Sequence, residues 1–325
     1  MANIYENLIS MWWKVNFSTD SFLEIKELSG GQSNQCFLLN SKFVLKIYIP
    51  KYKYANQNQD KYYKTCSKYQ ALLNNSGFTP KIIGIYNNDI ILKANAILME
   101  YVEGKDLSKL LYIYSQDMKF ESGRHVGKIL KSIHEAEMIP NQDYQTEGLL
   151  EEIKTQFEGA KKKNLLFPQI QKAVENTLLT YQPRIIKDNF VLTHGDAHPE
   201  NFILTRDDLK IIDLDMCKPS LRFVEMQMIL HAVCMPANLV SIELEQYYPD
   251  GSLVSWLKGI LAEYPEICPE KYLPEIKLIT LLEILYKFNL SEAVTNKDTP
   301  RQRALSMYNM IFEENLLEST IVKLN

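Results

Sequence analysis

Residues 193–202 read THGDAHPENF, and residues 211–215 read IIDLD. The first segment places an acid, Asp196, five residues before an amide, Asn201. The second segment adds another acid, Asp213, after a short hairpin-like connection. Phosphoryl transfer from a nucleotide requires such a set, because one carboxylate holds the acceptor hydroxyl while an amide and a second carboxylate hold magnesium. These two segments therefore predict phosphoryl transfer.

The three side chains have separate expected roles. Asp196 is predicted to be the general base that accepts the acceptor's hydroxyl proton and orients its oxygen. Asn201 and Asp213 are predicted to bind Mg²⁺, which prefers hard oxygen ligands and few protein contacts. Taken singly, an Asp or an Asn most often faces solvent in a loop. The joint spacing, with strand-like residues before both acids, favours the catalytic interpretation.

The histidines of the first segment suggest an alternative chemistry. His194, Asp196 and His198 alternate along the chain, and imidazole and carboxylate groups can share a transition metal. A metal-dependent hydrolase is thus a competing hypothesis, but it leaves Asn201 and the following strand unexplained. We expect His194 to be a buried imidazole that holds the loop. His198 is either a turn residue or a neighbour of the acceptor.

A lysine in an apolar strand is the candidate phosphate ligand. Lys46 lies within FVLKIY at residues 43–48, a pattern otherwise suited to burial. In kinases a strand lysine pairs with the nucleotide phosphates. The alternative is a lysine on the solvated face of an edge strand. The downstream acids favour the phosphate ligand.

A glycine-containing turn precedes that strand. Gly30, Gly31 and Ser33 belong to SGGQSN at residues 29–34, and such a turn can offer backbone N–H groups to phosphates. Taken alone, a Gly-Gly pair is more often an ordinary hairpin turn. The turn therefore only supports the nucleotide-binding hypothesis.

Two further acids are expected near the site. Asp215 lies two residues after Asp213, so both side chains would project to one side of an extended segment. Asp215 would contact a second magnesium ion, hold the ligands of the first magnesium ion in place, or cap the next turn. Glu225 lies on a predicted helix. It either hydrogen-bonds the catalytic loop from below or is an ordinary exposed acid.

The distribution of predicted elements indicates an α+β fold with two lobes. Strands are expected at residues 22–28, 35–39, 43–49, 82–86 and 90–102, with one helix ending near Leu73. Beyond Gly104 the pattern is mainly helical, with short strands near the catalytic segments. We expect a strand-rich N-terminal lobe at residues 1–102 and a catalytic, acceptor-binding lobe at 103–325, with the active site in the cleft. The helices are expected at residues 122–136, 147–162, 168–181, 223–233, 253–263, 275–289 and 301–317.

Composition indicates the class of protein and the compartment to expect. The 325 residues are 46% hydrophobic, which is enough for a sizeable core. No apolar run is long enough to span a membrane, and the N-terminus does not resemble a signal peptide. The five cysteines are odd in number and widely spaced, which favours a reducing cytoplasm. The net charge of −4 argues against a nucleic-acid partner.

With these motifs, the chain resembles the aminoglycoside phosphotransferase and choline kinase superfamily from about Phe22 to Leu290. These small-molecule kinases have a protein-kinase-like fold, and the protein kinase catalytic loop has the same acid-to-amide spacing. The resemblance implies that Glu100 and Tyr101 lie at the hinge where adenine binds. The family also has a glutamate on its first N-lobe helix that pairs with the lysine. Here Cys66 stands near that position, and Asp60 is the nearest upstream acid.

The resulting prediction is an ATP- and Mg²⁺-dependent kinase that phosphorylates a hydroxyl group of a small molecule. GTP in place of ATP stays open, as does the oligomeric state. Residues 236–325 carry 13 acids against 8 Lys or Arg, which favours a cationic acceptor such as an aminoglycoside or amino alcohol. The alternative, motivated by the missing helix glutamate, is a catalytically weak nucleotide-binding scaffold that acts through protein interaction.

Overall fold

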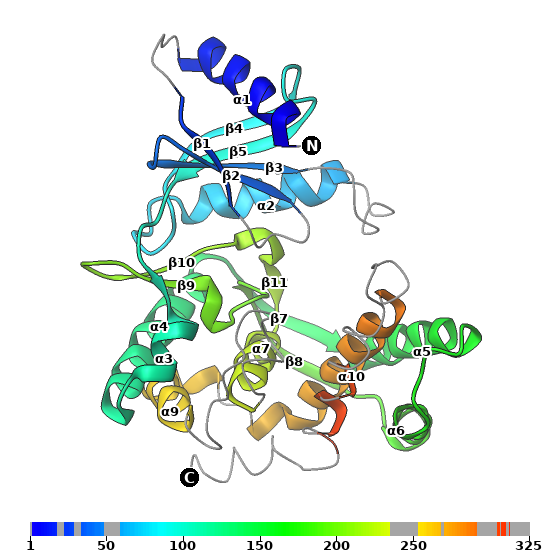
Figure 1. The fold of residues 1–325 in the computed structure, drawn as a ribbon. Coiled ribbons are helices and arrows are strands. Elements are labelled where there is room, and N and C mark those ends of the chain that lie inside the picture. The colour runs from blue at the N-terminus through cyan, green and yellow to red at the C-terminus, as the bar shows by residue number, and fades with distance from the viewer. Residues whose placement is uncertain are drawn as a thin grey trace. The chain divides into compact units, whose positions relative to one another are not determined.

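Two units make up the chain in the computed structural model, which is shown as a ribbon in Figure 1. The structure describes residues 2–17, 23–28, 34–48, 59–234, 253–267, 270–290, 304–305, 307–309 and 312. The first unit contains Met1–Lys105 and Phe202–Cys217, and the second contains Asp106–Asn201 and Lys218–Asn325. The segment with Asp213 and Asp215 thus belongs with the N-terminal residues, although it follows Asn201 in the chain. The lobe boundary after residue 102 stays a prediction.

A five-stranded antiparallel sheet with strand order β1-β2-β3-β5-β4 organises the first unit. Figure 1 shows helices α1 and α2 on its opposite faces. Successive side chains of a strand point to opposite faces. Leu45 and Ile47 therefore pack in the core with Trp12 of α1, whereas Lys46 and Tyr48 face α2. The elements are α1 (Ala2–Phe17), β1 (Ile25–Leu28), β2 (Gln35–Leu39), β3 (Phe43–Tyr48), α2 (Gln59–Leu73), β4 (Ile82–Asp89) and β5 (Ala94–Glu100).

The position of β3 decides between the two interpretations of Lys46. β3 lies between β2 and β5, where Lys46 stands opposite Cys36 on one side and Ile97 on the other. The strand is therefore central, and Lys46 is only 7% exposed. The edge-strand alternative is wrong.

The later segment of the first unit begins with a short hairpin. Strands β9 (Phe202–Leu204) and β10 (Leu209–Ile211) pair antiparallel. Ile211 donates its N–H to the carbonyl of Phe78 at 2.8 Å, which ties the hairpin to the residues after α2. The 3-10 helix η3 (Leu214–Met216) follows and contacts α2. The hairpin thus brings the second acidic motif to the sheet that carries Lys46.

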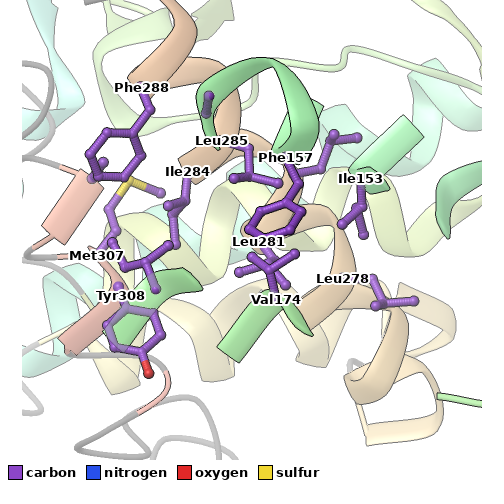
Figure 2. Packing of buried hydrophobic residues seen from close by; sticks show 14 of the residues in the cluster. Ile153, Phe157, Val174, Leu278, Leu281, Ile284, Leu285, Phe288, Met307 and Tyr308 are labelled. Atoms are coloured by element: carbon purple, nitrogen blue, oxygen red, sulfur yellow. The ribbon is translucent and has the colours of Figure 1, made fainter. Parts of the chain in front are cut away.

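The second unit is mainly helical. Its three-stranded sheet has the order β11-β8-β7, and α5, α6 and α10 share a hydrophobic core. Figure 2 shows Phe157, Leu281 and Leu285 interdigitating in that core. β6 (Lys105–Asp106) marks the passage from the first unit to the second. The remaining elements are α3 (Leu107–Ile113), α4 (Gln116–Ala136), β7 (Met138–Gln145), α5 (Thr146–Lys162), α6 (Pro168–Thr180), β8 (Ile185–Thr193), η2 (Pro199–Asn201), β11 (Lys218–Ser220), α7 (Arg222–Cys234), α9 (Val254–Glu263), η4 (Pro265–Ile267), η5 (Glu270–Tyr272) and α10 (Leu273–Leu290).

Glycines allow α4 and α9 to cross in close contact. A Cβ atom at Gly123 would clash with the carbonyl oxygen of Trp256. One at Gly259 would clash with the carbonyl oxygen of Phe120. Backbone therefore packs directly on backbone where the two helices cross.

The predicted elements agree well with the observed ones, with specific errors. β7 and α3 were not predicted, and β8 is nine residues long rather than one of the short strands expected near the catalytic segments. The strand expected from Ile90 begins only at Ala94, because a turn occupies residues 90–93. Most of the helix expected at 301–317 lies outside the described residues. No helix in the described part of the chain is both long and apolar enough to cross a membrane.

Candidate active site

The loop after β8 brings Asp196 and Asn201 together within the second unit. The Asn201 amide nitrogen donates to the main-chain oxygen of Asp196 at 2.8 Å and to its carboxylate at 3.2 Å. Asn201 is buried, at the end of the 3-10 helix η2, while the Asp196 side chain is 30% exposed. The loop thus fixes the amide and leaves the carboxylate in reach of solvent.

The two loop histidines have different surroundings. His194 is fully buried, and its Nδ1 accepts the N–H of Asp196 at 3.2 Å, as expected for a residue that holds the loop. His198 closes a turn by donating its N–H to the Asp196 carbonyl at 2.9 Å. Its Nε2 lies 3.5 Å from the Asp196 carboxylate and 3.3 Å from the Asn201 amide nitrogen. His198 is therefore a turn residue whose ring also borders Asp196.

A buried glutamate anchors this loop through its backbone. Glu225, near the start of α7, is fully buried and accepts N–H groups from His194 at 2.5 Å and Gly195 at 3.2 Å. It is thus no exposed helix acid, and these bonds favour the other alternative, a hydrogen bond to the loop. His134 of α4 lies 3.4 Å away through Nε2, and its Nδ1 lies 2.8 Å from the Tyr264 hydroxyl. The loop is therefore linked to α7, α4 and the end of α9.

The electrostatics at Glu225 follow from these contacts. Burial acts to raise the pKa of this carboxyl group, because a charge in a dry interior is costly. The contacts with His134 and the backbone N–H group of His194 outweigh burial, and the pKa of Glu225 is lowered. The ionised form that accepts the loop's N–H groups is thereby favoured.

The first unit holds a second charged cluster around Lys46. Its Nζ lies 2.7 Å from Asp213 and 2.6 Å from Asp215. Burial alone would lower the pKa of Lys46, but Asp215 and Asp213 raise it well above its ordinary value. Lys46 is thus held as a cation. The acid partner that the sequence did not identify is present.

The two acids differ in backbone and exposure. The segment is not extended, as the spacing had suggested, because Asp213 adopts a left-handed conformation with φ of 62° and Asp215 lies within η3. The turn nevertheless directs both carboxylates to Lys46. The Asp213 side chain is 46% exposed and that of Asp215 is 7% exposed. Only Asp213 therefore presents its carboxylate to solvent.

Asp215 accepts hydrogen bonds from three further side chains that the sequence did not connect with it. The donors are Asn34 at 2.6 Å, Tyr48 at 2.9 Å and Gln70 at 3.3 Å. Burial raises the pKa of Asp215, while Lys46 acts in the opposite sense. Gln70 stands one helical turn after Cys66, the residue that counting placed at the family's glutamate. The side chains of Cys66 and Asp60 lie outside the described part of the structure.

Each of the two predicted metal ligands carries an oxygen atom of the kind that suits a hard divalent cation. Asp213 offers carboxylate oxygens, which Mg²⁺ prefers. In the described part of the chain the hydrogen bonds of the Asn201 side chain are made through Nδ2, so its oxygen is the atom suited to a metal ion. Both residues therefore fit the metal-binding role expected of them. Among the described residues, no three His, Cys, Asp or Glu side chains form a group that could hold a metal ion.

The remaining predicted nucleotide ligands are only partly described. Gly30, Gly31 and Ser33 lie outside the described residues. Glu100 ends β5 and donates its N–H to Lys81, and Tyr101 donates its N–H to Lys42, both at 2.8 Å. The Glu100 carboxylate lies 3.7 Å from Nζ of Lys210. These contacts hold the backbone in place at the end of β5. The family resemblance predicts the adenine-binding hinge at this point.

Comparison with solved structures defines the fold as protein-kinase-like. An aminoglycoside 2'-phosphotransferase-IIIa bound to GDP matches with a TM-score of 0.62 and 14% identity, over 97% of this chain and 98% of that chain. Choline kinase from Cryptosporidium parvum Iowa II matches with a TM-score of 0.59 and 14% identity, over 98% of each chain. Ethanolamine kinase from Plasmodium vivax matches with a TM-score of 0.59 and 15% identity, over 94% of this chain and 88% of that chain.

The sequence itself identifies the family. The family model described as "Phosphotransferase enzyme family" matches residues 24–259, well over half of the chain. The chain therefore belongs to this phosphotransferase family, within the aminoglycoside phosphotransferase and choline kinase superfamily that its motifs resemble. A search of curated proteins found no match.

Proposed function

We propose that this chain is a small-molecule kinase that transfers the γ-phosphoryl group of ATP to a hydroxyl group, with Mg²⁺ as cofactor. The observation that carries the proposal is the loop after β8, where Asp196 and Asn201 are held together on a backbone anchored by Glu225. A base and a metal ligand on one fixed loop are what positioning catalysis requires. Family membership supports a phosphotransferase.

Each residue has a definite task in this proposal. Asp196, whose carboxylate is partly exposed, accepts the acceptor's hydroxyl proton and orients the oxygen. Asn201 and Asp213 would hold Mg²⁺, and the bound ion would supply positive charge that neutralises the nucleotide phosphates. Lys46 pairs with phosphate oxygens from the centre of the sheet. His194, His198 and Glu225 keep the loop in place.

The nucleotide is proposed to lie along the Lys46 face of the first unit's sheet. Gly30, Gly31 and Ser33 would cover its phosphates with backbone N–H groups, and Glu100 and Tyr101 would border the adenine. Structures of similar proteins include a complex with ATP and streptomycin and one with GDP and kanamycin. ATP is therefore the first nucleotide to test, and GTP the second.

A catalytic substitution tests the reaction. We expect Asp196→Asn to lower phosphoryl transfer by about 10²–10⁴-fold, because the amide cannot accept the proton. Binding of the nucleotide, measured by isothermal titration calorimetry with Mg²⁺ present, should be unchanged. Asp207→Asn, an exposed acid in the β9–β10 turn, is the matched control and should retain full activity. Full activity of the Asp196 variant would refute its role as the base.

The acceptor is proposed to be cationic, such as an aminoglycoside or an amino alcohol. The excess of acids in residues 236–325 motivates this choice. Turnover across a panel of cationic and neutral alcohols tests it, and a profile restricted to neutral alcohols would refute it.

The scaffold alternative has lost its motivation. It was motivated by the missing helix glutamate, and Lys46 instead has two other acid partners, Asp213 and Asp215. Nucleotide consumption that depends on an added acceptor would exclude a purely structural role.

A further inference from the structure

We propose that Asp215 is the positioning residue for Lys46, and that it replaces the acid that the family resemblance places on the first helix. This inference rests on the proposed function, in which Lys46 binds the nucleotide phosphates. In this chain the carboxylate comes from η3, after the β9–β10 hairpin, and α2 contributes the neutral amide of Gln70 instead.

Exposure separates the tasks of the two acids that contact Lys46. Asp213 is 46% exposed, so its carboxylate can turn toward a cation that arrives from solvent. Asp215 is 7% exposed and lies 2.6 Å from Nζ. A carboxylate that leaves Lys46 for a metal ion cannot also hold the lysine in place. Asp215 therefore remains as the fixed partner.

The hydrogen bonds of Asp215 argue against a role as a second metal ligand. Its Oδ1 accepts from Tyr48 and Gln70, and its Oδ2 accepts from Asn34 and Lys46. An ionised carboxylate has about four lone-pair sites. Four donors therefore occupy its accepting capacity, and a metal ion would have to displace one of them.

The position of Gln70 explains why an amide, and not an acid, suits this point of α2. Gln70 lies in the last turn of α2 and is buried. The same helix is tied to the sheet by Tyr63, whose hydroxyl contacts the carbonyl oxygens of Tyr86 and Ala96 and whose ring packs against Tyr48. A glutamate at position 70 would place a second negative charge beside Asp215, which is unfavourable in a buried site. An amide on the helix and an acid on η3 are thus complementary.

Because of this complementarity, the carboxylate can be moved by substitution from position 215 to position 70. The test uses Asp215→Asn, Gln70→Glu and the double variant, with the unmodified chain and Asp213→Asn as references. Asp215→Asn removes the fixed carboxylate while keeping its shape. The double variant returns a carboxylate to the same buried cluster from α2. A merely structural role for Asp215 would not be restored in this way.

The first measurement does not require activity. Reductive methylation of Lys46, followed by mass spectrometry, reports how well its amine is protected, with the exposed Lys26 and Lys42 as internal controls. We expect Asp215→Asn to raise the labelling rate of Lys46 by about tenfold, as for loss of a charge-assisted hydrogen bond, with the controls unchanged. The double variant should return to the rate of the unmodified chain. Unchanged labelling in Asp215→Asn, or no recovery in the double variant, would overturn the proposal.

The second measurement is steady-state phosphoryl transfer at varied Mg²⁺. We expect Asp215→Asn to lower kcat/KM by about tenfold or more, with the Mg²⁺ concentration for half-maximal activity unchanged. Asp213→Asn should raise that concentration instead. A higher Mg²⁺ requirement in Asp215→Asn would identify Asp215 as a metal ligand and overturn the proposal. If the unmodified chain transfers no phosphate, the proposed function fails, and the labelling result still decides the role of Asp215.

Discussion

Asp215 in the first unit and Glu225 in the second are both buried carboxylates, but they hold different things. Asp215 binds four side chains, one of them the cation Lys46. Glu225 binds two successive backbone N–H groups of the Asp196 loop. The first arrangement fixes the position of one long side chain, and the second fixes the course of the backbone. We therefore expect substitutions at Asp215 to affect function more than stability, and substitutions at Glu225 to affect both.

The largest effect is expected from Glu225→Ala. This substitution leaves the N–H groups of His194 and Gly195 buried without their acceptor, at a cost of about 1–3 kcal/mol for each group. The free energy of unfolding, from urea denaturation, should fall by about 3 kcal/mol or more. Glu225→Gln keeps an acceptor oxygen and should lose less. A near-neutral Glu225→Ala would show that the loop does not depend on this anchor.

The next largest loss of stability is expected where α4, which carries His134, packs against α9. His134 lies on α4, and its partner Tyr264 directly follows α9, so the glycine crossing of these helices sets their approach. Gly259→Ala should destabilise the chain by about 1–3 kcal/mol through overpacking. Gly148→Ala on α5 is the control, because nothing lies within 4 Å of its added Cβ atom. Equal unfolding free energies for the two variants would contradict the close packing.

A smaller effect is expected from acid. The folded-state pKa of Glu225 is lowered, so the unfolded chain binds a proton there more readily than the folded chain. Its contribution to stability is present above the ordinary glutamate pKa of about 4.3 and is lost as pH falls through the folded-state value. Glu225→Gln should flatten this part of the stability–pH curve. If the unfolding free energy of Glu225→Gln falls as steeply with decreasing pH, other carboxyl groups are responsible for that fall.

A smaller loss of stability than that of Glu225→Ala is expected for Asp215→Asn. Lys46 keeps Asp213 as a partner, so the loss should stay below the roughly 3–5 kcal/mol expected when a buried charge is left without any partner. The unfolding free energy should therefore fall by about 1–3 kcal/mol, because the amide accepts fewer of the hydrogen bonds that Asp215 accepts. A loss as large as that of Glu225→Ala would remove the contrast between the two carboxylates.

The sequence was most informative where the relevant residues are close in the chain. The spacing of Asp196 and Asn201 located the loop, and the alternation around Lys46 located β3, because both patterns are local. β7 was missed because it contains Pro140 and Asn141, which normally indicate a turn. It forms nevertheless by pairing with β8, with a register irregularity between Ile139 and Gln142.

The partners of Asp215 lie far from it in the chain. Gln70 is separated from it by 145 residues and Asn34 by 181. No local pattern links such positions, because only the folding of the β9–β10 hairpin onto the first unit brings them together. Counting along the sequence placed the expected acid at Cys66, four residues before Gln70. The sequence thus predicted the helix correctly, but it did not predict that an amide of this helix would contact an acid from η3.

The discontinuous first unit has a consequence for biosynthesis. Lys46 and Asp213 are separated by 167 residues, so the ribosome makes the sheet long before it makes the acids that neutralise the lysine. At about 5–20 residues per second, this delay is on the order of ten seconds or more. Until Cys217 has emerged, the nascent sheet carries a lysine whose counter-charges do not yet exist. Completion of this unit must therefore wait until Asp106–Asn201 of the second unit has been translated.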